Sequence, residues 1–123
     1  MTRGRAEGAH PALARLRALC TSLPGATERS AWGHPNFRTR TRTFATFEWI
    51  DGRPSIALRL DPADVDLLLK RPRFFSTPYG RGRWVSVWVD GRVSWTLVDR
   101  LVRRSHELAV RKRTDARSRT GNS

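Results

Sequence analysis

The stretch LPGATERSAWGHPNFR, residues 23–38, decides how the chain divides. Its prolines and glycines exclude a helix interior or a central strand. An apolar helical pattern precedes it, and strand-like patterns follow it. It also carries large groups that a solvated linker does not need, so we expect a long connection packed down on the domain. The residues that we expect to form this packed motif are Trp32, Gly33, His34, Pro35 and Phe37.

Upstream of this stretch the sequence predicts one helix that begins near Pro11, because proline suits the first turn of a helix. Residues 1–10 have no apolar period, and we expect them to be disordered. The single cysteine, Cys20, excludes an internal disulfide and a multi-cysteine zinc site, and it is expected in the core. Apolar residues recur at steps of three and four along the helix: Leu13, Leu16, Cys20 and Leu23.

Downstream, strands are predicted over residues 36–40, 43–50, 54–60, 73–79 and 84–89, with hairpin turns at Asp51-Gly52 and Asp90-Gly91. A helix is expected to begin at Asp61-Pro62, where the aspartate would accept free N–H groups of the first turn. A last helix is expected after Ser94 and ends near Val110. The apolar residues expected in one core between the sheet and the helices are Leu58, Leu60, Val85, Val87, Leu97 and Leu101.

The resulting order is α-β-β-β-α-β-β-α. It predicts an α+β domain of two layers, in which helices cover one face of an antiparallel, five-stranded sheet. We expect one domain over residues 11–110, between a disordered head (1–10) and a disordered basic tail (111–123).

The sequence offers few parts for catalysis. Its three histidines lack metal-ligand spacing, and no acid stands beside them as a partner. A phosphate-binding P-loop needs a lysine and a helix directly after its glycines. Neither follows Gly80 and Gly82, so we do not expect a P-loop there. His34 as a catalytic base is a weaker alternative to a turn histidine. We therefore expect a non-enzymatic, cytoplasmic protein with no metal, no cofactor and no membrane span.

Positive charge dominates the composition. Lysine and arginine total 24 against 11 acids, which gives a formal net charge of +13. A body this basic attracts polyanions. The alternative explanation is a coding bias toward arginine. We give polyanion binding and coding bias equal weight.

Two groups of residues are candidates for nucleic-acid binding. Basic loops and the basic tail would contact phosphates, while an uncovered sheet face would present tryptophans and an arginine as a stacking platform. The preferred alternative for the tryptophans is that residues 23–38 or a partner chain cover them as a second small core. The candidates are Arg38, Arg40, Arg42, Arg59, Arg81, Arg83, Trp84, Trp88, Arg111, Lys112 and Arg113.

The order of several short motifs resembles the MmcQ/YjbR family. The resemblance covers roughly residues 13–110, and its combination of motifs is specific. The motifs are Leu-Pro-Gly-Ala-Thr-Glu (23–28), Trp-Gly-His-Pro (32–35), Phe-Arg (37–38), Phe-Ala-Thr (44–46), Leu-Asp-Pro (60–62), Phe-Phe (74–75), Thr-Pro-Tyr (77–79), Trp-Val (84–85) and Val-Ser-Trp (93–95).

The resemblance implies a small α/β domain described as DNA-binding, with wing-like hairpins (a double wing). We therefore expect the basic loops to contact DNA with weak sequence specificity. Two alternatives stay open: a protein-interaction or chaperone-like module that uses the open sheet face, as a homodimer, and a small-molecule pocket under residues 23–38.

Overall fold

The computed structural model describes residues 10–80 and 82–122, with side chains described as far as Arg111. Within these ranges the order is one helix, four strands, a second helix, two strands and a last helix. The helices are α2 (Pro11–Thr21), α3 (Pro62–Leu68) and α4 (Trp95–Asn122), and the strands are β1 (Thr27–Ala31), β2 (His34–Arg38), β3 (Thr43–Ile50), β4 (Arg53–Arg59), β5 (Phe74–Ser76) and β6 (Trp84–Trp88).

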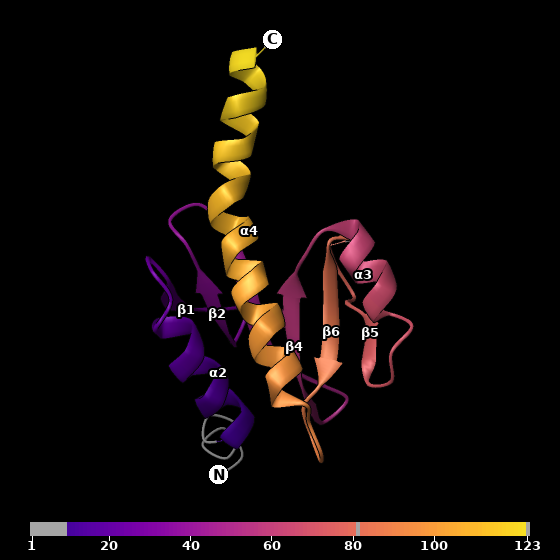
Figure 1. Ribbon diagram of the computed structural model, residues 1–123. Helices are drawn as coiled ribbons and strands as arrows, with labels where there is room; N and C mark the ends of the chain where they lie inside the picture. The colour runs from indigo at the N-terminus through magenta and orange to yellow at the C-terminus, as the bar shows by residue number, and fades with distance from the viewer. Residues whose placement is uncertain (1–9, 81, 123) are drawn as a thin grey trace.

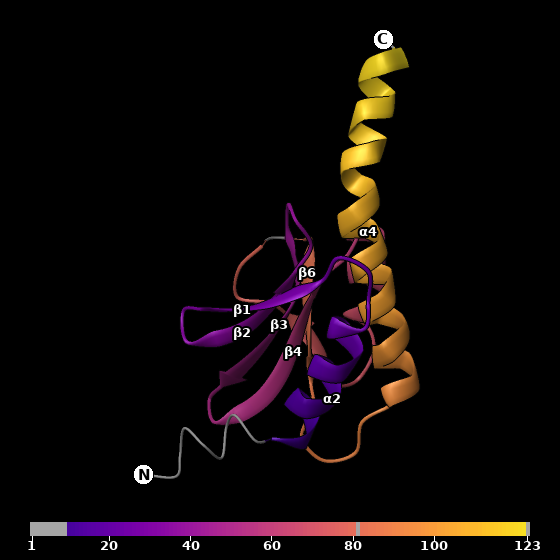
Figure 2. The same cartoon turned by 90° about the vertical axis from the view of Figure 1, so that its left-hand side faces the viewer.

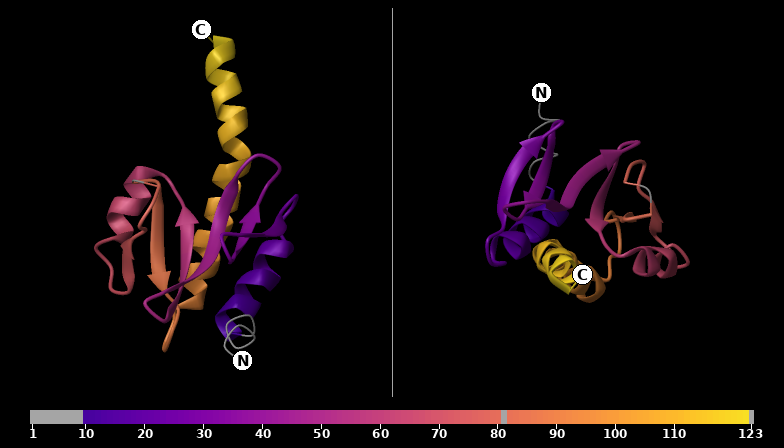
Figure 3. Two further views of the ribbon diagram at one scale, coloured as in Figure 1. Left: turned by 180° about the vertical axis from the view of Figure 1, so that it is seen from behind. Right: turned by 90° about the horizontal axis from the view of Figure 1, so that it is seen from above.

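The strands form one antiparallel sheet in the order β1-β2-β3-β4-β6-β5. Helices α2 and α4 lie together on one side of this sheet (Figures 1 and 2). The view from above shows the same two layers (Figure 3, right). The predicted α+β class is confirmed, although the sheet has six strands where the sequence predicted five.

The additional strand comes from residues 23–38, which form a hairpin where the sequence predicted an irregular connection. Strand β1 pairs with β2 through a two-residue turn of Trp32 and Gly33, both with positive φ (58° and 78°). Pro35 is tolerated within β2 because pairing with β3 starts only at Asn36. Phe37 is fully buried, whereas Trp32 is 95% exposed, so only part of the motif packs down.

A β-bulge distorts the centre of the sheet. Phe37 pairs with Ala45 and Arg38 pairs with Thr43, so Phe44 is an extra residue in β3. Both Phe44 and Ala45 are fully buried. The hydroxyl of Ser105 in α4 lies 2.6 Å from the carbonyl oxygen of Phe44, to which it donates a hydrogen bond. A helix side chain therefore satisfies backbone that the bulge removes from the strand ladder.

The core lies between the sheet and the helices. Leu58, Leu60, Val85 and Val87 are buried there, as predicted. The predicted full burial of Leu97 and Leu101 is wrong, because both are only half-buried. Contact of Ser105 with the sheet fixes the rotation of α4, and this rotation turns other residues inward. The innermost apolar residues of α4 are Val98, Val102 and Ala109.

Cys20 belongs to this core, as expected, and is completely buried. Burial raises the pKa of the Cys20 thiol to about 12, and the charge of Glu28 adds to the effect. The thiol is therefore held in its neutral form.

Two helix ends differ from the sequence prediction. The Asp61 side chain makes no capping hydrogen bond at α3. It lies instead 3.7 Å from Arg104 of α4, where a guanidinium competes with the backbone N–H groups. Helix α4 continues to Asn122, although an end near Val110 and a disordered tail over 111–123 were expected. Residues 111–120 contain neither proline nor glycine, so nothing in that run ends the helix.

The last turns of α4 project beyond the sheet (Figure 1). The predicted disordered head lies almost entirely outside the described residues. Within the described part of the chain, none of the helices combines the length and hydrophobicity that a membrane span requires.

Candidate nucleic-acid interface

Side chains on the face of the sheet opposite the helices form what we call the open face, although Ser55, Ala57 and Ser86 at its centre are fully buried. Strand alternation places Ile56, Leu58, Val85 and Val87 in the core, so the intervening residues of β4 and β6 point the other way. The strand register pairs these residues as Ser55 with Trp88, Ala57 with Ser86, and Arg59 with Trp84.

Trp88 lies at one end of this face, under neighbours from its own chain. Its ring stacks on Phe75 at a centroid distance of 4.2 Å, and the Arg53 guanidinium lies 4.0 Å from the centroid of the Trp88 ring. Asp90 holds Arg53 in place through an ion pair of 2.8 Å. Trp88 is therefore packed by local side chains and not by residues 23–38.

Trp84, at the other end of β6, is held by the segment that precedes it. The Tyr79 ring meets it edge-on at 5.8 Å. A Cβ atom on Gly80 would lie 2.0 Å from the Trp84 ring, so only glycine fits there. The Tyr79 hydroxyl donates to Glu48 Oε2 at 2.6 Å, and the Thr46 hydroxyl lies 3.4 Å away. Burial and the Glu48 carboxylate raise the pKa of Tyr79 above its usual range.

Three arginines converge at the Trp84 end of the sheet, and we call them the arginine cluster: Arg42, Arg59 and Arg83. Arg42 precedes β3, Arg59 ends β4 and Arg83 precedes β6, so the antiparallel topology brings them together. Burial lowers the pKa of Arg59, and the charges of Arg42 and Arg83 lower it further, against a smaller opposing effect of Asp61. Over the described ranges 10–80 and 82–111, none of the three forms an ion pair.

The β2–β3 turn extends this cluster. Arg38 ends β2, and its Nε donates to the Thr39 carbonyl at 3.3 Å. Arg40 is exposed at the tip of the turn. The structure therefore brings six predicted residues to one end of the sheet: Arg38, Arg40, Arg42, Arg59, Arg83 and Trp84.

The remaining predicted binding residues are not part of this group. Trp88 lies at the opposite end of β6, and Arg111 is exposed on α4. Arg81 lies outside the described residues, as do the side chains of Lys112 and Arg113.

A pocket of about 430 Å³ opens beside the arginine cluster. The sequence predicts roles for the lining residues Trp32, His34 and Trp84 but not for the polar residues between them. The alternation of β3 is the signal that could have found two of these, because it places Thr46 and Glu48 opposite the buried Ala45 and Phe47. The lining residues are Ala31, Trp32, His34, Asn36, Thr43, Thr46, Glu48, Tyr79 and Trp84.

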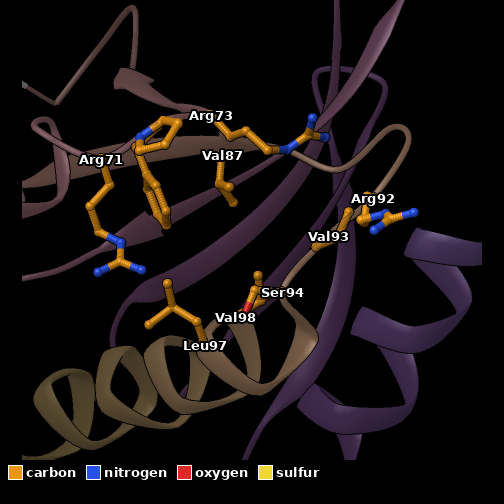
Figure 4. A pocket seen from close by; sticks show the side chains of 10 residues that line it. Arg71, Arg73, Val87, Arg92, Val93, Ser94, Leu97 and Val98 are labelled. Atoms are coloured by element: carbon orange, nitrogen blue, oxygen red, sulfur yellow. The ribbon is translucent and has the colours of Figure 1, made fainter.

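A second pocket, also of about 430 Å³, lies on the helix side between the start of β5 and the start of α4. Val87 and Leu97 point into it, whereas the Arg92 guanidinium points away (Figure 4). Arg73 is occupied by Asp90, which its Nη2 meets at 3.1 Å. This pocket offers mainly apolar surface and no acid–base pair.

The histidines take separate places. His10 Nδ1 accepts the Ala12 N–H at 3.0 Å, His34 lines the first pocket, and His106 is buried. Among the described side chains, no group of three His, Cys, Asp or Glu residues is arranged to hold a metal ion.

Three proteins with solved structures resemble this chain in fold. A protein of Pseudomonas syringae with a solved structure is 17% identical, with a TM-score of 0.67 over 78% of this chain and 97% of that one. A Deinococcus radiodurans protein described as having a DUF419 domain is 24% identical, with a TM-score of 0.70 over 81% and 78% of the two chains. A DUF1801-family protein of Bacillus subtilis is 16% identical, with a TM-score of 0.60 over 93% and 90%. These likenesses show a shared fold.

No curated protein matches the chain. The sequence profile of the YjbR family matches residues 21–108, from the end of α2 to the middle of α4. This range contains the whole sheet, the arginine cluster and the pocket beside it, and the chain belongs to the MmcQ/YjbR family.

Proposed function

We propose that this protein is a non-enzymatic DNA-binding protein whose arginine cluster, Arg42, Arg59 and Arg83, contacts backbone phosphates. Arg38 and Arg40 of the β2–β3 turn extend the contact along the strand. Phosphate contacts position a protein on DNA without reading bases, so the proposal includes weak sequence specificity.

The observation that carries this proposal is that Arg42, Arg59 and Arg83 meet at one end of the sheet, where none of them forms an ion pair with the described residues. Arg59 is partly buried between Arg42 and Arg83, and their charges disfavour its protonated form. Like charges held together this way cost folding free energy unless an anion neutralises them. A phosphate between the guanidinium groups would convert the repulsion into charge-assisted hydrogen bonds.

Trp84 supports the same surface. It pairs with Arg59 across the strands and lines the adjacent pocket. An aromatic ring beside unpaired arginines is the combination that binds both parts of a nucleotide.

The alternative of a homodimer through the open face requires free tryptophans. Trp88 is instead stacked on Phe75 and capped by Arg53. This local packing favours the arginine end as the working surface.

The test is a titration of fluorescent duplex DNA at several salt concentrations. It compares the wild type with a triple variant, Arg42→Ala, Arg59→Ala and Arg83→Ala. Each lost phosphate contact reduces the slope of log affinity against log salt by about 0.9, so the triple variant should flatten it by up to about 2.7. Affinity for different duplex sequences should fall equally.

The matched control replaces three exposed arginines elsewhere: Arg29, Arg100 and Arg103. It removes the same charge, and no ion pair of these three is found within the described residues. Arg15 and Arg17 would be a poor control because they pair with Asp99 and Glu28. If the two triple variants lose the same DNA affinity, the binding comes from diffuse electrostatic attraction, and the proposal is overturned. Loss of a dimer in size-exclusion chromatography after Trp88→Ala, with DNA affinity unchanged, would favour the alternative.

A further inference from the structure

Trp32 lies in a turn where a tryptophan side chain adds nothing visible to the stability of the fold. Its side chain is 95% exposed and its φ is 58°, in a two-residue hairpin turn with Gly33. Such turns favour asparagine followed by glycine, and a bulky residue at positive φ is strained. An exposed aromatic ring in a strained position indicates a functional role.

Trp32 is also one of the residues that line the pocket on the open face. Tyr79 and Trp84 also line this pocket, and they come from the segment on the opposite side of the central strands. The volume of about 430 Å³ lies within the usual range for small-molecule sites, about 300–1,000 Å³. The pocket therefore suits a flat ring held among aromatic side chains.

Hydrogen-bond acceptors form the polar part of the lining. Asn36 Nδ2 donates to the carbonyl oxygens of His34 at 2.9 Å and of Ala31 at 3.3 Å, which leaves Asn36 Oδ1 as an acceptor. Glu48 is buried, and its Oε2 accepts the Tyr79 hydroxyl at 2.6 Å, which leaves Oε1. A ligand that satisfies these oxygens must bring hydrogen-bond donors, and the amino groups of nucleobases are donors of this kind.

The arginine cluster supplies the other half of the ligand chemistry. Arg42 directly precedes the lining residue Thr43, and Arg83 directly precedes Trp84. The β-bulge contributes to this arrangement, because Thr43 and Thr46 both line the pocket while Phe44 and Ala45 enter the core. Arg59 also pairs across the strands with the lining residue Trp84, so the arginine cluster lies at the same end of the sheet as the pocket.

We propose that this pocket receives one unstacked nucleobase with an exocyclic amino group, while the arginine cluster holds its phosphate. The inference rests on the proposed function and adds a base-binding step to it. Glutamate accepts the amino group of cytosine in known complexes. Thymine has carbonyl oxygens on both sides of its ring N–H, and these would face the Glu48 carboxylate. The same chemistry is available from a single strand or from a free nucleotide.

The test uses the full chain and measures binding of single-stranded oligomers of about twelve nucleotides, within the site sizes of single-strand binders. The probes are oligo-dC, oligo-dT and an abasic strand of equal length, with dCMP as competitor. Wild type should prefer oligo-dC to oligo-dT by about tenfold, the scale of one good base contact. Glu48→Gln keeps the acceptor for Tyr79 but adds a donor, so the preference should fall toward one.

Trp32→Asn removes the ring and supplies the residue that this turn favours. It should weaken oligo-dC binding by about tenfold, the scale of one stacked base, without lowering the melting temperature. Binding of the abasic strand should not change. A dCMP competitor that displaces oligo-dC would identify the free nucleotide as a ligand, and binding of the oligomer alone would identify the strand.

Equal binding of oligo-dC and the abasic strand would overturn the base-binding pocket. So would unchanged oligo-dC affinity in Trp32→Asn. Neither result touches the phosphate proposal, which fails only if the arginine triple variant behaves like its matched control. The two proposals can therefore fail separately.

Discussion

His106 of α4 and Pro24 of the α2–β1 connection are joined by a hydrogen bond across 82 residues of sequence. The His106 Nε2 atom lies 2.7 Å from the Pro24 carbonyl oxygen. Since a carbonyl can only accept, Nε2 carries the proton. The same ring meets Phe44 edge-on at a centroid distance of 5.3 Å, so it ties the connection, the helix and the bulged strand together.

We expect His106→Phe to lower the free energy of unfolding by about 1–3 kcal/mol, because the Pro24 carbonyl loses its donor while the aromatic contact with Phe44 is kept. Urea denaturation followed by tryptophan fluorescence measures the change. Arg103→Ala, on the exposed side of the same helix, should stay within about 0.5 kcal/mol of wild type. Equal stability of wild type and His106→Phe would show that the bond contributes nothing.

The rotation of α4 makes a second prediction. Val102 is completely buried and Leu101 is half-buried, so Val102→Ala should cost about 1.5–3 kcal/mol, the scale for a fully buried valine side chain. Leu101→Ala should cost less, although it removes more atoms. Thermal or urea unfolding of the two variants decides the order, and a larger loss in Leu101→Ala would mean that the helix packs in another rotation.

The contact between Tyr79 and Glu48 predicts a dependence on alkaline pH. The pKa of Tyr79 is raised in the folded state, so the folded chain keeps a proton that the unfolded chain releases near pH 10. The stabilisation is present below pH 10 and is lost progressively as pH rises toward the raised pKa. The difference in unfolding free energy between wild type and Tyr79→Phe should shrink over this range.

Tyr79 is the only tyrosine of the chain, so its ionisation can be followed directly by ultraviolet absorbance. Titration of the native protein should give a midpoint above that of the urea-unfolded protein. Coincident midpoints would contradict the buried contact with Glu48.

The regular elements were largely predictable because their sequence patterns are local. Asp51-Gly52 marks the β3–β4 turn, and Pro62 marks the start of α3. Strand β1 was not predictable, since its residues Thr27–Ala31 are mostly exposed and show no apolar alternation. It exists through backbone pairing with β2, which leaves no hydrophobic signal in the sequence.

The candidate site also has a part that the sequence predicts and a part that it does not. The basic loops were recognisable because charge is visible in any sequence, but their meeting point depends on the order of strands. Tyr79 and Glu48 lie 31 residues apart and meet only because the segment before β6 crosses the open face to β3. The bulge at Phe44 also changes which residues of β3 share a face, and no alternation pattern predicts such a shift.

The place of Ser105 in the sequence has a consequence for synthesis. Its Oγ atom lies within hydrogen-bond distance of the carbonyl oxygens of Phe44 and Arg59, 61 and 46 residues earlier in the chain, and its single proton can be donated to either of them. All six strands are therefore synthesised before the group that completes the bonding of β3 and β4 is added. Until α4 emerges, the nascent sheet exposes its apolar face and two unpaired carbonyl groups to the cell, which is the interval in which chaperones would bind it.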